Sequence, residues 1–161
     1  MFFTIFVTAT AFFTKKVTIM RKIWRATTVT PELFEGINRL LPQLSTSANP
    51  LSPSDIERLL ANDSTHLYIA EIDGKIVGML SLVVVDIPTG LKVWIEDVVV
   101  DKVARGLHIG HALVERAKAE AESLGARKIY LTSNPSRKAA HALYRKCGFE
   151  HYDTTLFRII L

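Results

Sequence analysis

The sequence predicts a mixed α/β domain with a twisted, mostly antiparallel sheet of six to seven strands and helices on both faces. Asp73-Gly74, between two runs rich in β-forming residues, is a strong hairpin signal. A strand at 91–100 leads into a long amphipathic helix at about 109–124, and a further strand at 128–133 follows that helix. This alternation of strands and helices is typical of a layered sheet-and-helix architecture.

The chain before residue 90 is expected to hold one strand, two helices and the hairpin. Thr30 and Pro31 suit the N-cap and the first position of a helix. Asp55 stands in a capping-box place after Ser52. The elements expected here are a strand at 21–26, a helix at 32–41, a proline-rich loop at 42–53, a helix ending near Leu60, and hairpin strands at 65–72 and 75–86 with a bulge at Gly78.

The chain after residue 90 is expected to alternate between strands and helices. Glycines mark both helix ends, as is common where a left-handed residue stops a helix. The elements expected here are a strand at 91–100, a helix at 109–124 stopped by Gly125, a strand at 128–133, a helix from Ser136 to Cys147 ended by Gly148, and strands at 149–153 and 155–161.

Composition limits the classes of function. The 161 residues suit one domain, and 48% apolar with 22% charged residues is a normal globular balance. A net charge of +4 is too small for a dedicated nucleic-acid binder. It suits an anionic ligand or simply a solvated basic surface. The single cysteine, Cys147, excludes an internal disulfide and fits a reducing cytoplasm, where we expect the protein to be located.

Residues 1–19 are expected to be an extension outside the domain at 20–161. Their apolar stretch precedes Lys15 and Lys16, the reverse of the order in a secretory signal. The stretch is also shorter than the roughly 20 residues of a membrane helix. We therefore expect no membrane partner, and interpret the extension as an over-extended start or a loosely attached strand. A short interfacial anchor is the alternative.

The connection from Arg105 to Gly110 has the features of an anion site. A strand that turns directly into a helix aims several unpaired N–H groups and the positive end of the helix dipole at one point. Gly106 and Gly110 allow close approach of the backbone, and Arg105 adds charge-assisted hydrogen bonds. The alternative interpretation is a plain glycine-bearing connection.

Two separated motifs resemble those of the GNAT superfamily of acyl-CoA-dependent N-acetyltransferases. The first has Arg105, then His108 in place of the family's first glycine, then Gly110. The second is Leu143-Tyr144 followed by Gly148-Phe149, which matches in full. The element order agrees over 23–161. The resemblance implies an enzyme that moves an acetyl group from acetyl-CoA to a primary amine of a small molecule or peptide, by direct attack in a ternary complex.

The resemblance also implies roles for individual residues. Tyr144 would protonate the departing thiolate, which suits a phenol that is neutral at pH 7. Arg137 replaces an asparagine that often contacts the pantetheine arm. A homodimer formed through the C-terminal strands is one expected assembly. The residues implied to bind the cofactor are Val98, Val99, Val100, Arg105, Gly106, Leu107, His108, Ile109, Gly110, Arg137 and Tyr144.

Glu96 is the candidate general base. Strict alternation along the strand gives it the same facing as Val98 and Val100, and a carboxylate there can accept the amine's proton through a water. Asp97 is then expected on the opposite face. The strand also looks like the equivalent one of glucosamine-6-phosphate N-acetyltransferases, which makes an amino-sugar phosphate an alternative acceptor.

The histidines suggest a metal site only weakly. His108, His111 and Glu115 can share one helical side, but His108 belongs to the turn and no cysteine or aspartate cluster completes a site in the sequence. We therefore expect no metal. Cys147 is expected to be a small, half-buried residue.

Two functions other than catalysis remain open from the sequence. One is a CoA-binding module that has lost turnover, an alternative suggested by the departure of His108 and Arg137 from the family's pattern. The other is an interaction domain of the same architecture without enzymatic activity. The acceptor pocket is expected between the loop at 42–53 and the far end of the hairpin, and neither carries a readable specificity signal.

Overall fold

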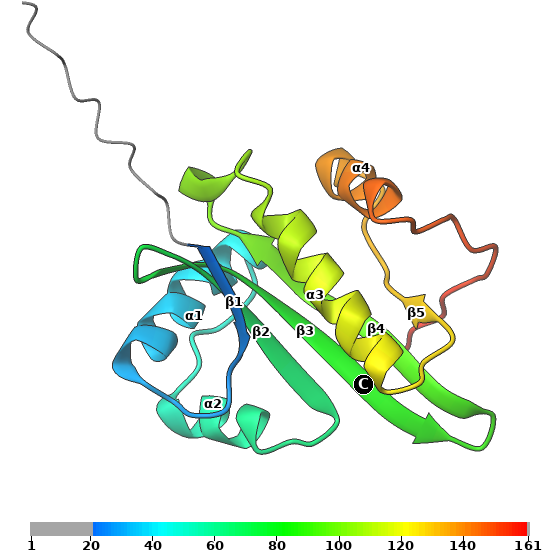
Figure 1. Cartoon of the computed structure of the whole chain (residues 1–161), viewed down its shortest axis with the longest axis horizontal. Coiled ribbons are helices and arrows are strands. Elements are labelled where there is room, and N and C mark those ends of the chain that lie inside the picture. The colour runs from blue at the N-terminus through cyan, green and yellow to red at the C-terminus, as the bar shows by residue number, and fades with distance from the viewer. Residues whose placement is uncertain (1–20, 161) are drawn as a thin grey trace, which may run out of the picture.

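The computed structural model describes residues 21–160 as a five-stranded sheet with four α-helices (Figure 1). The extension predicted at 1–19 lies outside the described residues. In chain order the elements are β1 (Arg21–Arg25), α1 (Pro31–Leu44), α2 (Pro53–Leu60), β2 (Thr65–Ile72), β3 (Lys75–Ile87), β4 (Gly90–Val100), a 3₁₀ turn (Lys102–Ala104), α3 (Ile109–Ser123), β5 (Ile129–Tyr130) and α4 (Lys138–Lys146).

The strands lie in the order β1-β2-β3-β4-β5. The first three pairings are antiparallel, and the β4–β5 pairing is parallel. This confirms the mixed, mostly antiparallel sheet, but with five strands instead of six to seven. The predicted bulge near Gly78 is also present, because the β2–β3 register shifts between Ala70 and Glu71, next to the pair Ala70–Gly78.

Helices cover both faces of the sheet, as predicted (Figure 1). On one face α3 packs its buried Leu113 and Val114 against Leu80 and Leu82 of β3. On the other face α1 and α2 contribute a separate buried cluster that includes Leu33, Leu40 and Ile56. Burial of a leucine or isoleucine side chain stabilises a fold by roughly 1.5–3 kcal/mol. The apolar cluster on each face therefore holds the helices of that face against the sheet.

The start of each N-terminal helix is confirmed. The hydroxyl of Thr30 accepts a hydrogen bond of 3.2 Å from the N–H of Leu33. Ser52 and Asp55 form a reciprocal capping box at the start of α2. The predicted end of α1 at residue 41 was wrong, because the helix continues through Pro42 to Leu44. Leu44 packs against the cluster on the α1 face, and this packing outweighs the hydrogen bond that proline cannot donate.

The C-terminal part has less regular structure than the sequence predicts. β5 contains two residues instead of the six at 128–133. α4 begins at Lys138 with Arg137 at the N-cap position, and the hydroxyl of Ser136 donates to Asn134 Oδ1 instead of capping the helix.

No strand forms over 149–153 or 155–160, so those two predicted strands are corrected. Leu156 and Phe157 there are exposed, at 75% and 85%. Strand formation depends on pairing with a neighbouring strand and on a buried face, and this segment pairs with none of the described strands and leaves its apolar side chains exposed.

Among residues 21–160, no helix combines the length and the apolar character that crossing a membrane would require.

Candidate active site

A β-bulge at Asp97 sets the geometry of the site. Ser81 pairs with Glu96 and Met79 pairs with Val99, so β4 has one residue more than β3 between these pairs. Asp97 adopts a left-handed backbone conformation with φ of 52°. An extra residue in one strand shifts the alternation of its side chains by one position.

The bulge corrects the predicted facing of Glu96. Before it, Ile95 packs into the core beneath α3, and after it Val98 packs into the same core. Glu96 therefore faces the α1 side of the sheet together with Val99, and not the side of Val98 and Val100. Strict alternation along the sequence could not reveal this change of face.

β4 and β5 separate just before the bulge. Their parallel pairing consists of Val93 with Ile129 and Trp94 with Tyr130. From Ile95 to Val100 the described residues pair β4 with β3 alone. The other edge of this segment therefore presents backbone N–H and C=O groups that a ligand can use.

A cleft of about 320 Å³ opens beside this free edge. Its walls come from the end of α1, from β4, from the segment after β5 and from α4. The residues that carry polar groups into it include Glu96, Asp97, Thr132, Ser133, Arg137 and Tyr144. The structure thus brings Glu96, Arg137 and Tyr144 into one cleft, and it places Asp97 there as well.

Burial tunes the two candidate catalytic groups. Burial, and then the neighbouring charge of Asp97, raises the pKa of Glu96. Burial also raises the pKa of Tyr144, while Arg137 lowers it and the charges of Cys147 and Glu96 raise it further. Tyr144 is therefore a neutral phenol that holds a proton at pH 7, as a general acid must.

Arg137 joins two parts of the cleft wall. Its guanidinium donates a hydrogen bond of 2.7 Å to the carbonyl oxygen of Leu44, at the end of α1. The sequence suggested that this side chain contacts the cofactor or an acidic substrate group. In the structure it lies in the cleft with one donor directed at α1, and its contact with a ligand stays a prediction.

The predicted anion site lies where β4 passes into α3. The first backbone bond of α3 runs from Ala112 N–H to the carbonyl of His108. The N–H groups of Ile109, Gly110 and His111 precede that bond, in the position where helices leave donors without an intrahelical partner. Donors of this kind, at the positive end of a helix dipole, suit a phosphate group.

Glycine has different roles at the two glycine positions of this turn. Gly106 has φ of 80°, and among the described residues no atom beyond its chain neighbours lies within 4 Å of the position that a Cβ would take, so its role is conformational. A Cβ on Gly110 would lie 2.9 Å from Leu143 Cδ2, so this glycine admits the side chain of α4. His108 also has a positive φ, of 59°, and this conformation is a physical reason for the glycine that other sequences carry there.

Three residues that sequence reasoning missed hold the turn in place. Arg39 Nε lies 3.4 Å from Asp101 Oδ2, and Arg39 also donates to the carbonyl of Ile76. Gln43 Oε1 accepts a hydrogen bond of 3.0 Å from Lys102 N–H. Of these three residues, only Asp101 stands out in the local sequence, because it directly follows a strand. The α1 partners are distant in sequence, so no spacing rule could have found them.

Comparison with known proteins gives the site a context. The model of the acetyltransferase (GNAT) family matches residues 31–149. A search of curated proteins finds no match. A solved structure from Agrobacterium tumefaciens, described as an acetyltransferase, is 26% identical, with a TM-score of 0.77 and coverage of 87% of this chain and 99% of that one.

Two further solved structures share the fold at lower identity. Glucosamine-6-phosphate N-acetyltransferase from Arabidopsis thaliana is 24% identical with a TM-score of 0.73, covering 87% of this chain and 98% of its own. An aminoglycoside N-acetyltransferase, solved in complex with CoA, is 17% identical with a TM-score of 0.75, covering 89% and 96%.

Proposed function

The chain belongs to the acetyltransferase (GNAT) family and is an acyltransferase, and from this premise we propose that it acetylates a primary amine with acetyl-CoA. The observation that carries the proposal is the cleft in which Glu96 and Tyr144 meet beside the free edge of β4. A base, an acid and an unpaired strand edge are what direct transfer from a thioester to an amine requires.

The proposed cofactor path follows the free backbone groups. The pyrophosphate would bind the N–H groups at the start of α3, next to Arg105, and the turn from Gly106 to Gly110 would surround it. The pantetheine arm would pair with the free edge of Val98–Val100. Leu107 and Ile109 would contribute backbone contacts, with Ile109 anchored in the core.

The proposed reaction uses one side chain as a base and another as an acid. Glu96, acting through a water, takes a proton from the acceptor amine, whose nitrogen lone pair attacks the thioester carbonyl. The carbon–sulfur bond breaks, its electron pair stays on sulfur, and Tyr144 gives that sulfur its proton. The acylated nitrogen loses its remaining extra proton to solvent, Glu96 releases the proton that it took, and Tyr144 recovers a proton from solvent. The products are an amide and free CoA thiol.

The charges in the cleft support a small cationic acceptor. Glu96 and Asp97 are adjacent carboxylates in a cleft of about 320 Å³, and they attract a protonated amine before it loses its proton. Arg137 also lines the cleft and supports a second candidate, an amino-sugar phosphate whose phosphate would meet the guanidinium.

Release of CoA thiol tests the proposal. The purified chain is incubated with acetyl-CoA and, separately, polyamines, aminoglycosides, glucosamine, glucosamine-6-phosphate and short peptides. We expect thiol release with at least one amine above the rate without amine. A preference for glucosamine-6-phosphate over glucosamine that Arg137→Met removes would select the second candidate.

Binding of CoA separates the two ways in which this test can fail. Binding measured by calorimetry, with no thiol release for any amine, would indicate a CoA-binding module without turnover. Absence of CoA binding would contradict the proposal altogether.

A further inference from the structure

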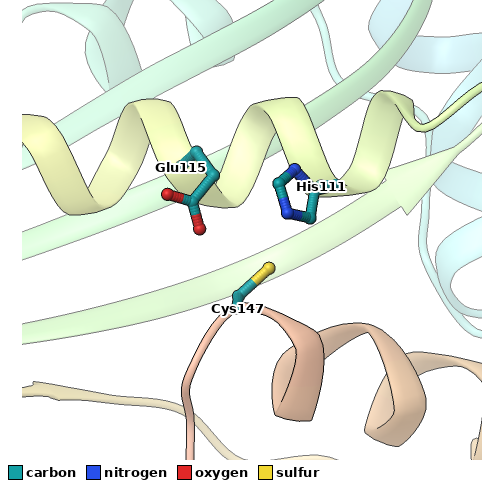
Figure 2. Close-up of side chains that lie close together, drawn as sticks. All are labelled: His111, Glu115 and Cys147. Carbon is teal, nitrogen blue, oxygen red and sulfur yellow. The ribbon is translucent and has the colours of Figure 1, made fainter.

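A cluster of three potential metal ligands lies between α3 and the end of α4. His111, Glu115 and Cys147 each offer one ligand atom, and these atoms all lie within 4.8 Å of one another. Figure 2 shows His111 and Glu115 projecting from α3 toward the sulfur of Cys147. The sequence offered His108, a residue of the turn, as the third ligand beside His111 and Glu115, whereas the structure brings Cys147 to this pair.

The fold holds these three side chains together. His111 and Glu115 are four positions apart, so they lie one above the other on the same side of α3. Lys118, one turn further along, donates a hydrogen bond of 2.8 Å to the carbonyl oxygen of Cys147. The close approach of Gly110 to Leu143 brings the start of α3 against α4. The convergence therefore follows from the packing of two helices.

The chemistry of the three ligands is that of a zinc site. Imidazole nitrogen, carboxylate oxygen and cysteine sulfur bind Zn²⁺ at about 2.0–2.3 Å in tetrahedral geometry, which separates the ligand atoms by roughly 3.3–3.8 Å. The ligand atoms lie within 4.8 Å of one another, so they must approach by about 1 Å to reach that geometry. We propose that His111, Glu115 and Cys147 bind one divalent transition-metal ion of the zinc class, with water in the fourth position.

Lys118 and the thiol proton are the groups that the ion would replace. Lys118 Nζ lies 3.0 Å from Glu115 Oε1, but this pair is partly exposed and therefore weak. Burial, and then the charge of Glu115, raises the pKa of Cys147, so the thiol is protonated without metal. On binding, the Cys147 S–H bond breaks, the proton leaves to solvent, and the sulfur electron pair forms the bond to the ion.

A nucleophilic cysteine explains the same cluster less well. Cys147 is only 3% exposed, and its pKa is raised by burial, whereas reactive cysteines are accessible and have a lowered pKa. A buried thiol between an imidazole and a carboxylate is suited to coordination, because a divalent ion supplies the positive charge that stabilises the thiolate.

Metal binding would connect the two helices that carry the proposed acetyl-transfer site. α3 presents its first N–H groups to the cofactor, and α4 carries Tyr144 one turn before Cys147. The ion would therefore fix α4 against α3. The inference does not depend on turnover, because the metal site uses side chains outside the cleft and its occupancy is measured without acetyl-CoA.

The test is a titration of the tag-free full chain with Zn²⁺ and, separately, Co²⁺. We expect one ion per chain, a thiolate-to-cobalt charge-transfer band, and a rise in melting temperature of about 5–10 °C at a hundredfold excess over the dissociation constant. Cys147→Ser should abolish the charge-transfer band and weaken binding at least tenfold. Glu115→Gln should weaken binding by a similar factor.

Matched controls are available on the same elements. Glu122→Gln changes an exposed glutamate of α3, and His151→Ala changes an exposed histidine after α4; both should bind Zn²⁺ like the unaltered chain. Should Cys147→Ser fail to fold, the thiolate-to-cobalt charge-transfer band of the Co²⁺-loaded unaltered chain, weakened in His111→Asn and in Glu115→Gln, answers the same question. No binding at micromolar Zn²⁺, or binding unaffected by these ligand variants, would overturn the proposal.

Discussion

Glu96 and Tyr144 lie in the same cleft, and after burial the charge of Glu96 is among the causes that raise the pKa of Tyr144. This relationship favours the protonation states that acetyl transfer needs. When Glu96 ionises and becomes a base, its charge helps Tyr144 to keep the proton that the thiolate will take. Each of the two groups therefore has a distinct kinetic signature.

Tyr144→Phe should lower kcat by about 10²–10⁴, the usual contribution of a positioned general acid. The KM for acetyl-CoA should change little, because the ring and its contact with Phe149 remain. Steady-state release of CoA thiol measures both constants. Tyr152→Phe is the matched control, since Tyr152 is exposed and does not line the cleft. An unchanged kcat in Tyr144→Phe would remove the phenol from the mechanism.

Glu96→Gln should remove the acid limb of the pH profile of kcat/KM. A base works when ionised, so activity rises as the pH increases through the pKa of Glu96, which burial and Asp97 raise. Asp97→Asn should move that limb to lower pH, because the variant lacks the negative charge that opposes ionisation. Asparagine also tolerates the left-handed conformation at this position. A limb that persists in Glu96→Gln would assign the base elsewhere.

Two substitutions in the anion-binding turn should change stability in opposite directions. His108→Gly relieves a non-glycine residue at φ of 59° and should raise the free energy of unfolding by about 0.5–1 kcal/mol. Gly106→Ala imposes a side chain at φ of 80° and should lower it by about 1–2 kcal/mol. Denaturant unfolding measures both, and the same sign for both variants would contradict this account.

The His108→Gly variant also answers a question about the cofactor. Weaker CoA binding, measured by calorimetry, would identify the imidazole as a ligand, and tighter binding would identify it as an obstacle.

Gly110→Ala should destabilise the fold by about 1–3 kcal/mol through overpacking against Leu143. Leu143→Ala removes the obstructing methyl groups, so the double variant should be more stable than the sum of the single effects predicts. Thermal and denaturant unfolding of the four chains give this coupling. Strict additivity would mean that the two residues do not share the space.

Local signals predicted the elements whose cause is local. Thr30 and Ser52 mark helix starts through a hydroxyl three residues from its donor, and Asp73-Gly74 marks a hairpin through two residues. The elements of the N-terminal two thirds of the fold could be predicted from the sequence for this reason. The apolar residues after 154 have strand propensity, but a strand also needs a partner, which no local pattern supplies.

Motifs and residue chemistry drew attention to Glu96, Arg137 and Tyr144, which line one cleft in the structure, and their roles stay predictions. The facing of Glu96 was wrong because one bulged residue reverses alternation, and no side-chain pattern in Ile95–Val100 indicates it. Cys147 lies close to His111 and Glu115 because α3 and the end of α4 pack together, and no local sequence pattern predicts this packing.

The end of the β4–β5 pairing at Trp94 divides β4 into two parts. Val93 and Trp94 pair with strands on both sides, whereas from Ile95 to Val100, the part that contains the bulge at Asp97, β4 pairs with β3 alone among the described residues. A library of variants should therefore tolerate insertions differently on the two sides of Trp94, because the part that follows it is held by one neighbouring strand instead of two.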